Sequence, residues 1–509
     1  MRLNFFKTFK LDWLILLLIV LNLIKLYKID GGLVLGESDE WSYLEVARNF
    51  YNNPLPSYSG VPAYYSLPLY PFLAFLFSFL FPIKFLSLRL VSLLASIGLT
   101  IIVFFYLKNK TNKFTAFLAS IIFIFSPLSV FYSRLGLIEM SLTFFVFSGL
   151  VLFESALDRK NKLLGFFSGI LLGLGILSKY TALIFILVII IYLLVKVVLN
   201  FNKKSLGIIQ ILLFHLLALA LVTIPIVLTL IFYDRSNFKW QTLQTLNRNN
   251  RPDTFFLLDY LKNSFEFFTP LVVFFIFIGV LSLLQRKLRG FELIFLSLIF
   301  LLYFIFKQNI TPRYLVVILP FISIFAGYGA YIAFQFIKSR LKIRPFILQI
   351  SFIFIVVFSM FQSSLKALNS SYHTFVEDVG RFVGTINKDD RWILTNYWPS
   401  IYIDETRSYK TTWLSGDLAD SKAFSTFPKS KYAKIDEPSF EILNKEGAIV
   451  ILEDFFSKNI TADKRKEAEF FIRNNFQPLK IFEDKNPNWP FKFNGEVNRI
   501  YVYYIPAKK

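Results

Sequence analysis

Residues 206–233 read LGIIQILLFHLLALALVTIPIVLTLIFY and contain no Asp, Glu, Lys or Arg. An apolar run of this length can cross a hydrocarbon layer of about 30 Å as an α-helix. Ten other long apolar runs lie within the first 361 residues, at 11–27, 85–107, 114–132, 140–156, 163–177, 181–198, 268–284, 291–306, 314–336 and 346–361. The sequence therefore predicts a polytopic α-helical membrane protein with about eleven transmembrane helices.

Two apolar segments need a separate interpretation. The first run follows a basic flank and could be a secretory signal, but no small-residue cleavage pattern comes after it, so we interpret it as a retained span. Residues 67–82 are apolar but short, and they contain Pro68, Pro71 and Pro82. We expect this segment to be re-entrant or interfacial rather than a full crossing.

Positive charge is concentrated in the membrane part. Residues 1–363 contain 33 Lys and Arg against 14 Asp and Glu, whereas the remainder contains 22 against 20. If the N-terminus is cytoplasmic, the cytoplasmic loops and helix ends hold 19 of those basic residues and only four acidic ones. This asymmetry follows the positive-inside rule, so we expect a plasma-membrane protein with a cytoplasmic N-terminus and an extracytoplasmic C-terminal region. Because the charge has this explanation, no nucleic-acid partner is expected.

The last part of the chain has the composition of a soluble protein. Strand patterns lie at 391–396, 448–453, 479–483 and 499–505, and helical patterns lie at 375–386 and 462–474. We therefore expect two domains, a membrane domain at 1–362 and an extracytoplasmic α/β domain at 363–509.

The long first loop on the expected outer side contains two adjacent carboxylates, Asp39 and Glu40. Trp41 and Leu44 follow with helical spacing, which predicts an amphipathic helix lying along the membrane surface. Both carboxylates would then lie at the start of this helix, near the lipid boundary. Ser38 or Asp39 could simply cap the helix while Glu40 interacts with the helix dipole, and the sequence leaves this alternative open.

Four more charged residues lie at predicted helix ends on the same side. Arg134 and Glu139 flank the turn between two spans, Lys179 ends a Gly-rich helix, and Arg313 precedes a later span. Charges at membrane depth cost about 2.5 to 3.5 kcal/mol each and usually serve a function. Arg134 could instead pair with Glu139, and Lys179 and Arg313 could be snorkelling anchors. Together, three cations at one level beside carboxylates suit an anionic lipid headgroup.

The order of these motifs resembles the GT-C glycosyltransferases. It comprises an Asp-Glu pair in a long first outer loop, an Arg followed by an acid, a Gly-rich helix ending in Lys, and Arg-Tyr-Leu with a later Pro. The resemblance is strongest to the branch of protein mannosyltransferases and bacterial lipid A aminoarabinose transferases, and it covers roughly residues 11–361. It implies the GT-C fold and transfer of a sugar from a polyprenyl-phosphate donor to an acceptor hydroxyl outside the membrane.

This resemblance also implies roles for the carboxylates. Asp39 matches the acid of the first loop and is the best candidate for the general base, with Glu40 beside it, whereas Glu139 matches the acidic position of the second loop. One base and one displacement predict inversion at the anomeric carbon. Relatives tend to carry Lys or His before the prolines of the short apolar segment, whereas Ser66 stands there in this chain.

Neutralising the donor phosphate is the chief requirement for breaking a bond between a sugar and a phosphate. Arg134, Lys179 and Arg313 are therefore the predicted donor-phosphate ligands. The chain has no Cys and only two His, far apart in sequence, so no metal centre is predicted. A divalent cation held weakly by two or three carboxylates is left open.

A transporter or lipid flippase is the main alternative, because such proteins also need many spans and interfacial charges. Transport pathways usually show ionisable residues near the centres of spans, and these are almost absent here. We therefore favour a glycosyltransferase whose acceptor hydroxyl belongs to a lipid, a glycan or a protein.

Overall fold

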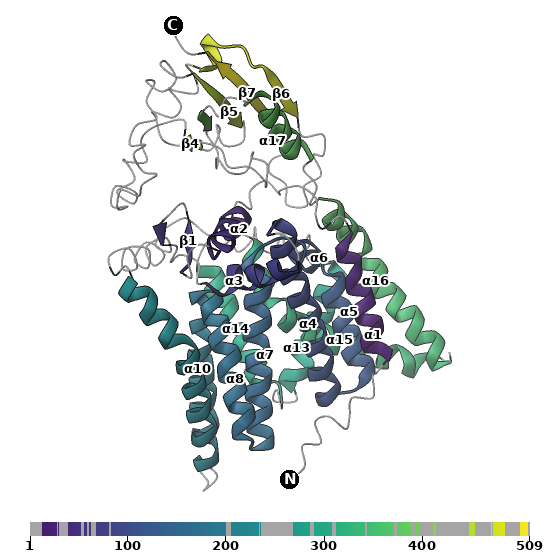
Figure 1. The fold of residues 1–509 in the computed structure, drawn as a ribbon. Helices are drawn as coiled ribbons and strands as arrows, with labels where there is room; N and C mark the ends of the chain where they lie inside the picture. Colours follow the sequence, from purple (N-terminus) through teal and green to yellow (C-terminus); the bar gives the residue numbers. More distant parts are fainter. Residues whose placement is uncertain are drawn as a thin grey trace. The chain divides into compact units, whose positions relative to one another are not determined.

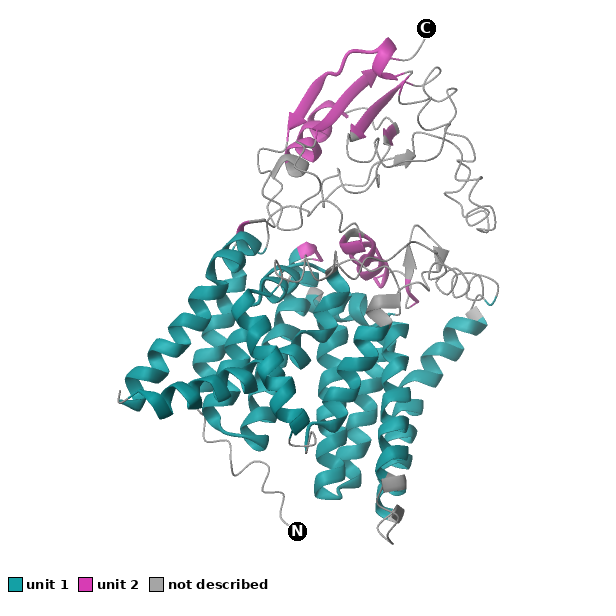
Figure 2. Ribbon diagram, turned by 180° about the vertical axis from the view of Figure 1, so that it is seen from behind, with its two compact units in different colours: residues 1–29, 64–82, 86–368 teal, residues 30–63, 83–85, 369–509 magenta. Residues whose placement is uncertain are grey.

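The computed structural model describes residues 13–27, 29, 39–51, 55–58, 61–62, 68–80, 83–199, 205–233, 235, 268–285, 290–307, 312–341, 344–370, 374–387, 392–395, 411–413, 447–453, 470, 472–483 and 499–506. The chain divides into two compact units, coloured separately in Figure 2. Unit 1 comprises 1–29, 64–82 and 86–368, and unit 2 comprises 30–63, 83–85 and 369–509. The long first loop thus belongs to the same unit as the C-terminal region, and the predicted boundary at residue 362 lies inside a helix.

Unit 1 is a bundle of apolar helices (Figure 1). Its elements are α1 (Trp13–Asn22), η1 (Leu23–Leu26), α3 (Leu69–Leu76), η2 (Phe77–Phe79), α4 (Phe85–Lys110), α5 (Lys113–Phe125), α6 (Pro127–Tyr132), α7 (Ile138–Arg159), α8 (Lys162–Ser178), η3 (Tyr180–Leu183), α9 (Ile184–Leu199), α10 (Ser205–Tyr233), α13 (Pro270–Gln285), α14 (Glu292–Lys307), η5 (Pro312–Ile318), α15 (Leu319–Arg340) and α16 (Pro345–Ser370). Each of the eleven predicted spans coincides with one or two of these elements, and the short proline-containing segment forms α3 and η2.

Five helical segments are long and apolar enough to cross a membrane by length and composition. They are Phe85–Lys110, Ile138–Arg159, Gly207–Phe232, Arg313–Arg340 and Pro345–Asn369, and six shorter apolar helices accompany them within the described ranges. Leu217, Leu221 and Phe232 of α10 are exposed in the isolated chain, as expected for side chains that face lipid. An integral membrane protein with many helices is therefore confirmed.

The helix ends coincide with local signals in the sequence. The side-chain oxygen of Asn112 accepts a hydrogen bond from the Thr115 amide (3.0 Å) and caps the start of α5. Asn161 caps α8 in the same way, accepting from the amide of Leu163 at 2.9 Å. Such caps satisfy amide groups that have no partner within the helix. They fix where the chain reverses between neighbouring helices.

Small residues allow several helices to approach closely. A side chain at Gly279 of α13 would collide with the carbonyl of Phe325, and one at Gly329 of α15 would collide with the carbonyl of Phe275. Glycine at both positions therefore lets α13 and α15 pack backbone against backbone, which is a common arrangement between membrane helices.

Unit 2 contains a five-stranded sheet in the order β4-β3-β5-β7-β6. The strands are β3 (Trp392–Thr395), β4 (Thr411–Trp413), β5 (Ala448–Glu453), β6 (Lys480–Glu483) and β7 (Arg499–Ile505). β4, β3 and β5 run parallel, whereas β7 is antiparallel to both β5 and β6. The buried core of this sheet contains Leu394, Val450, Leu452, Ile472 and Tyr503.

The predicted α/β domain at the C-terminal end is thus confirmed. All four predicted strands exist, α17 (Thr374–Ile386) matches the first predicted helix, and β4 was not predicted. The second predicted helix, at 462–474, falls mostly outside the described residues. Unit 2 also contains the predicted loop helix as α2 (Asp39–Asn49) and a small antiparallel pair, β1 (Ser57–Tyr58) with β2 (Val61–Pro62).

Candidate active site

Glu139 lies in the first turn of α7, directly after the turn that connects α6 to α7. Its side chain is buried, with only 1% exposed. A carboxylate in the first turn of a helix interacts favourably with the helix dipole. That interaction is too small to balance the burial of a charge, so Glu139 needs partners of opposite charge.

Two cations supply those partners. Oε1 of Glu139 lies 2.9 Å from Nζ of Lys179 and 3.7 Å from Nε of Arg313. The second oxygen, Oε2, is buried and has no hydrogen-bond partner among the residues that the structure describes. Three predicted site residues that are far apart in the sequence therefore meet in unit 1. We call this group the Glu139 cluster.

Helix connectivity explains the convergence. Lys179 follows the last residue of α8, and its backbone is extended, with φ −157° and ψ 136°, which ends the helix. Glu139 lies at the start of α7, which precedes α8 in the chain, so the beginning of one helix meets the end of the next. Arg313 lies in the first turn of η5, which leads into α15. All three side chains consequently lie at the same end of the helix bundle.

Tyr314 is an aromatic member of this cluster that the sequence did not single out. Its ring centroid lies 4.3 Å from Nζ of Lys179 and 5.3 Å from Cζ of Arg313. Cations within about 6 Å of an aromatic face are attracted to it. Its sequence signal is its place in the Arg-Tyr-Leu motif, directly after Arg313.

Electrostatics keep Lys179 charged. Burial by itself would lower the pKa of Lys179, which lies in the connection between two helices. The Glu139 carboxylate and Tyr314 together outweigh this effect, so the pKa is raised above its ordinary value of 10.5. The side chains of Lys179 and Arg313 remain 20% and 19% exposed, whereas that of Glu139 is 1% exposed. The two cations thus lie nearer the surface than the carboxylate that holds them.

Arg134 has a different environment. Its side chain is buried, and its guanidinium donates hydrogen bonds to the carbonyls of Leu368 and Tyr27, both at 2.6 Å. These contacts connect the turn before α7 to the ends of η1 and α16. Its predicted contact with a donor phosphate stays a prediction.

Lys25 reinforces the same region and was not predicted as a site residue. Its ammonium is fully buried and donates to Asn22 Oδ1 at 3.0 Å and to the hydroxyls of Ser96 and Ser129 at 2.9 Å. Ser129 lies in α6, close to the turn that carries Arg134. Lys25 and Arg134 therefore make reciprocal connections between η1 and the segment that leads to Glu139.

Asp39 and Glu40 form the first turn of α2 in unit 2, as the sequence predicted. Glu40 is buried and Asp39 is partly exposed. The same helix buries Leu44 and Ala47, which agrees with the predicted amphipathic face. The convergence of these two carboxylates with the Glu139 cluster stays a prediction.

No group of three or more His, Cys, Asp or Glu side chains is arranged to hold a metal ion among the residues that the structure describes. The weakly held divalent cation considered from the sequence remains an expectation.

Comparison with known proteins agrees with this fold. Residues 62–228 match the family model described as dolichyl-phosphate-mannose-protein mannosyltransferase. No curated protein sequence matches the chain significantly. The solved structures of similar fold are those of membrane glycosyltransferases, so the chain has a fold of the GT-C class. The predicted resemblance is thereby confirmed, and the transporter alternative is not favoured.

Within that class, the chain is similar along nearly its whole length to ArnT from Cupriavidus metallidurans. The apo structure of ArnT has a TM-score of 0.69 at 11% identity, covering 96% of this chain and 97% of ArnT. ArnT bound to undecaprenyl phosphate has a TM-score of 0.63 at 12% identity and covers 98% of both chains. The archaeal oligosaccharyltransferase AglB from Archaeoglobus fulgidus has a TM-score of 0.62 at 14% identity, covering 88% of this chain and 70% of AglB.

Proposed function

We propose that this glycosyltransferase moves a sugar from a polyprenyl-phosphate donor to an acceptor hydroxyl on the outer side of the membrane. The single observation that supports this most is the Glu139 cluster, in which a buried carboxylate holds two partly exposed cations at one end of a bundle of apolar helices. The fold similarity to ArnT bound to undecaprenyl phosphate, and to AglB in complex with a dolichol-phosphate, supports a donor of this kind.

In this proposal Lys179 and Arg313 bind the donor phosphate. Both cations are partly exposed, so a phosphate oxygen can approach each of them. Hydrogen bonds between ionised donors and phosphate oxygens are short and strong. They become stronger as negative charge builds up on the leaving phosphate, so they stabilise the transition state more than the bound substrate.

Glu139 is better suited to holding these cations and orienting the substrate than to removing a proton. Its Oε1 is already engaged by Lys179 and Arg313. Oε2 is free to accept a hydrogen bond from a hydroxyl of the sugar or the acceptor. In this proposal Arg134 positions Glu139 indirectly, because its hydrogen bonds fix the turn that leads into α7.

Asp39 is the proposed general base, with Glu40 beside it in α2. A carboxylate oxygen of Asp39 takes the proton from the acceptor hydroxyl, and the acceptor oxygen bonds to the anomeric carbon. The bond from that carbon to the phosphate oxygen breaks, and polyprenyl phosphate leaves with the electron pair. A single displacement of this kind inverts the anomeric configuration. Base catalysis contributes roughly 10²- to 10⁴-fold.

The orientation follows from the charge distribution. We propose a cytoplasmic N-terminus and an extracytoplasmic unit 2, because this arrangement places the basic loops inside. The Glu139 cluster then lies at the outer end of the bundle, where a polyprenyl tail can stay in lipid while the phosphate reaches the protein. The acceptor is a lipid, a glycan or a protein that offers a hydroxyl group.

The direct test uses the purified full chain in lipid nanodiscs with labelled polyprenyl-phosphate hexoses and pentoses. Wild type should form a covalent glycosyl product and release polyprenyl phosphate in equal amounts, and the product should have the inverted configuration by NMR. Movement of the labelled lipid between leaflets of proteoliposomes without any covalent product would contradict the proposal and support a flippase.

A further inference from the structure

The start of α7, which carries Glu139, has no cap supplied by its own sequence. Leu137 is the N-cap residue, and no side-chain hydrogen bond closes the first turn. An asparagine at such a position satisfies amides of the first turn, as Asn112 does for α5 and Asn161 does for α8. The first turn of α7 therefore depends on contacts from other helices.

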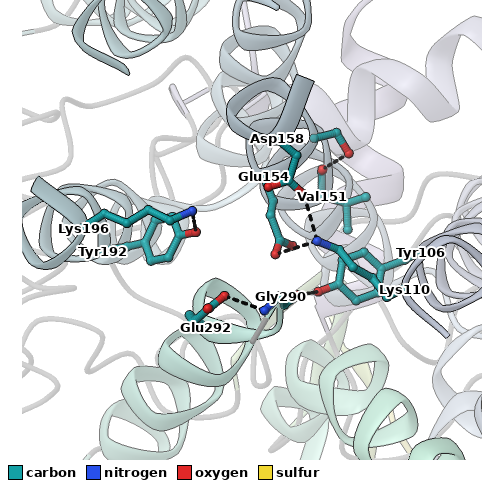
Figure 3. Close-up of polar contacts among 10 residues, drawn as sticks. Tyr106, Lys110, Val151, Glu154, Asp158, Tyr192, Lys196, Gly290 and Glu292 are labelled. Carbon is teal, nitrogen blue, oxygen red and sulfur yellow. Dashed lines mark hydrogen bonds and ion pairs between the residues drawn. The ribbon is translucent and has the colours of Figure 1, made fainter. Parts of the chain in front are cut away.

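The second half of α7 is anchored at the opposite end of the bundle, as Figure 3 shows. Nζ of Lys110 on α4 lies 3.2 Å from Oε1 of Glu154 and 2.9 Å from Oδ2 of Asp158, both on α7. Glu139 and Glu154 are roughly 22 Å apart along the helix at about 1.5 Å per residue. These ion pairs are too distant to position the carboxylate of Glu139.

A buried serine on α4 supplies a contact at the start of α7. The hydroxyl of Ser92 donates to the carbonyl of Leu137 at 3.1 Å, and Ser92 is fully buried. The carbonyl of an N-cap residue accepts the first hydrogen bond within the helix, and its second lone pair can accept from an outside donor. A donor at this position fixes the orientation of the peptide group with which α7 begins. Glu139 follows Leu137 by two residues.

Tyr70 of α3 extends this contact to a third helix. Its hydroxyl lies 3.0 Å from Oγ of Ser92 and 2.9 Å from the carbonyl oxygen of Leu88, and Tyr70 is fully buried. When Ser92 gives its one proton to Leu137, Tyr70 can donate to Ser92. Both hydroxyls are then satisfied inside the bundle, where an unpaired polar group is costly. Tyr70 thereby holds the Ser92 side chain in the orientation that reaches Leu137.

The short proline-containing segment, residues 67–82, gains a role from this arrangement. Its helix α3 buries Tyr70 and Ala74 and exposes Phe72 and Leu76 in the isolated chain. α3 also contacts α8, one of the two helices joined by the ion pair of the Glu139 cluster. One face of α3 therefore packs against the helices that carry this cluster.

We propose that Tyr70 and Ser92 are positioning residues, which fix the first turn of α7 and thereby the place of Glu139 beside its two cations. The inference rests on the proposed function, because it assigns these residues to the same site. Both side chains act through the backbone of α7 rather than on the substrate. A hydrogen bond between neutral groups contributes up to about tenfold in a rate, which sets the size of the expected effect.

Steady-state kinetics of the purified full chain in lipid nanodiscs tests this role. Ser92→Ala should lower kcat about tenfold and leave the donor KM within about twofold of wild type, because both cations keep their charges. Tyr70→Phe keeps the ring and the contact between Ser92 and Leu137, so it should lower kcat only about threefold. In a Glu139→Gln background, Ser92→Ala should change kcat by less than about twofold, since the carboxylate that it positions is gone.

The same helix offers a matched control. The buried hydroxyl of Ser168 on α8 donates to the carbonyl of Gly149 on α7 at 2.8 Å, roughly 15 Å beyond Glu139 at about 1.5 Å per residue. Ser168 also contacts Nδ1 of His215 at 3.0 Å, so Ser168→Ala should lower the thermal midpoint at least as much as Ser92→Ala while kcat stays at the wild-type value. Unchanged kcat in Ser92→Ala, equal loss of kcat in both variants, or strictly additive effects of Ser92→Ala and Glu139→Gln would overturn the positioning role.

A second measurement does not depend on sugar transfer. The amides of residues 141–145 form the first hydrogen bonds within α7, so hydrogen–deuterium exchange there reports how firmly the helix start is held. Exchange should be faster in Ser92→Ala than in wild type and unchanged in Ser168→Ala. Faster exchange in a chain that transfers no sugar would support the positioning of α7 and contradict only the proposed function. Unchanged exchange in a fully active Ser92→Ala would overturn the positioning role and leave the proposed function intact.

Discussion

The ammonium of Lys179 lies 2.9 Å from the carboxylate of Glu139, and this ion pair joins the end of α8 to the first turn of α7. The carboxylate is buried while the ammonium is partly exposed, so the pair has a protected side and an accessible side. Such an arrangement presents a fixed cation to a ligand at little reorganisation cost. The proposed function depends on this relationship more than on any single residue.

Replacing Lys179 with alanine should raise the KM for the polyprenyl-phosphate donor by about 10- to 100-fold, because a hydrogen bond between charged groups is lost. Lys179→Arg should retain part of the affinity. Because Glu139 raises the pKa of Lys179 above 10.5, the ammonium stays charged between pH 6 and 9, and the donor KM should show no titration of this group there. Steady-state kinetics over that range is the measurement, and an unchanged KM in Lys179→Ala would make the residue an anchor only.

Replacing Glu139 with glutamine should leave Lys179 and Arg313 without the charge that orients them. We expect kcat to fall about 100-fold, the size of effect produced by misplacing reacting groups by about 1 Å. A double-mutant cycle with Lys179→Ala isolates the pair, and its coupling energy should be about 1 to 3 kcal/mol. Strictly additive effects of the two substitutions would show that the ion pair plays no part in catalysis.

Asp39→Asn should lower the rate of sugar transfer by roughly 10²- to 10⁴-fold while donor binding stays within a few-fold of wild type. The amide keeps the shape of the side chain but cannot accept the proton. Glu45→Gln in the same helix is a suitable control and should keep its activity. Full activity of purified Asp39→Asn would remove this residue from the mechanism.

Arg134→Ala should act mainly on stability. The substitution deletes donors to the buried carbonyl of Leu368 and the partly buried carbonyl of Tyr27, at a cost of about 2 to 4 kcal/mol. The thermal midpoint of unit 1, followed in detergent by circular dichroism, should fall by several degrees. Donor KM in the folded fraction should stay near the wild-type value. A raised KM with normal stability would instead support Arg134 as a ligand of the donor phosphate, as the sequence predicted.

Glu154→Gln should destabilise the opposite end of the bundle. It removes one of the two carboxylates that hold Lys110, and because Lys110 is partly exposed and keeps Asp158, we expect a loss of about 1 to 2 kcal/mol. Lys113→Met, an exposed neighbour, should change the thermal midpoint by much less. The comparison separates the specific ion pair from a general change of charge at this membrane surface.

The helices of unit 1 and most strands of unit 2 could be predicted from local sequence patterns. Residues 448–453 and 499–505 have the apolar patterns typical of strands. They form β5 and β7, which are neighbours in the sheet. β4 escaped prediction because Thr411–Trp413 is too short to show a period. The grouping of residues 30–63 with the C-terminal region also carries no local signal, since it arises from contacts between distant segments.

The sequence by itself determined the membrane class, the helices and which charged residues merit attention, because hydrophobic length and charge at a helix end are local properties. Only the tertiary structure decided how those charges are used. Arg134 and Lys179 look equivalent as isolated cations at helix ends, yet the first donates to backbone carbonyls and the second pairs with Glu139. A side chain's partner depends on which helix ends the packing brings together. That packing results from contacts between segments that lie far apart in the chain, so no local pattern reveals it.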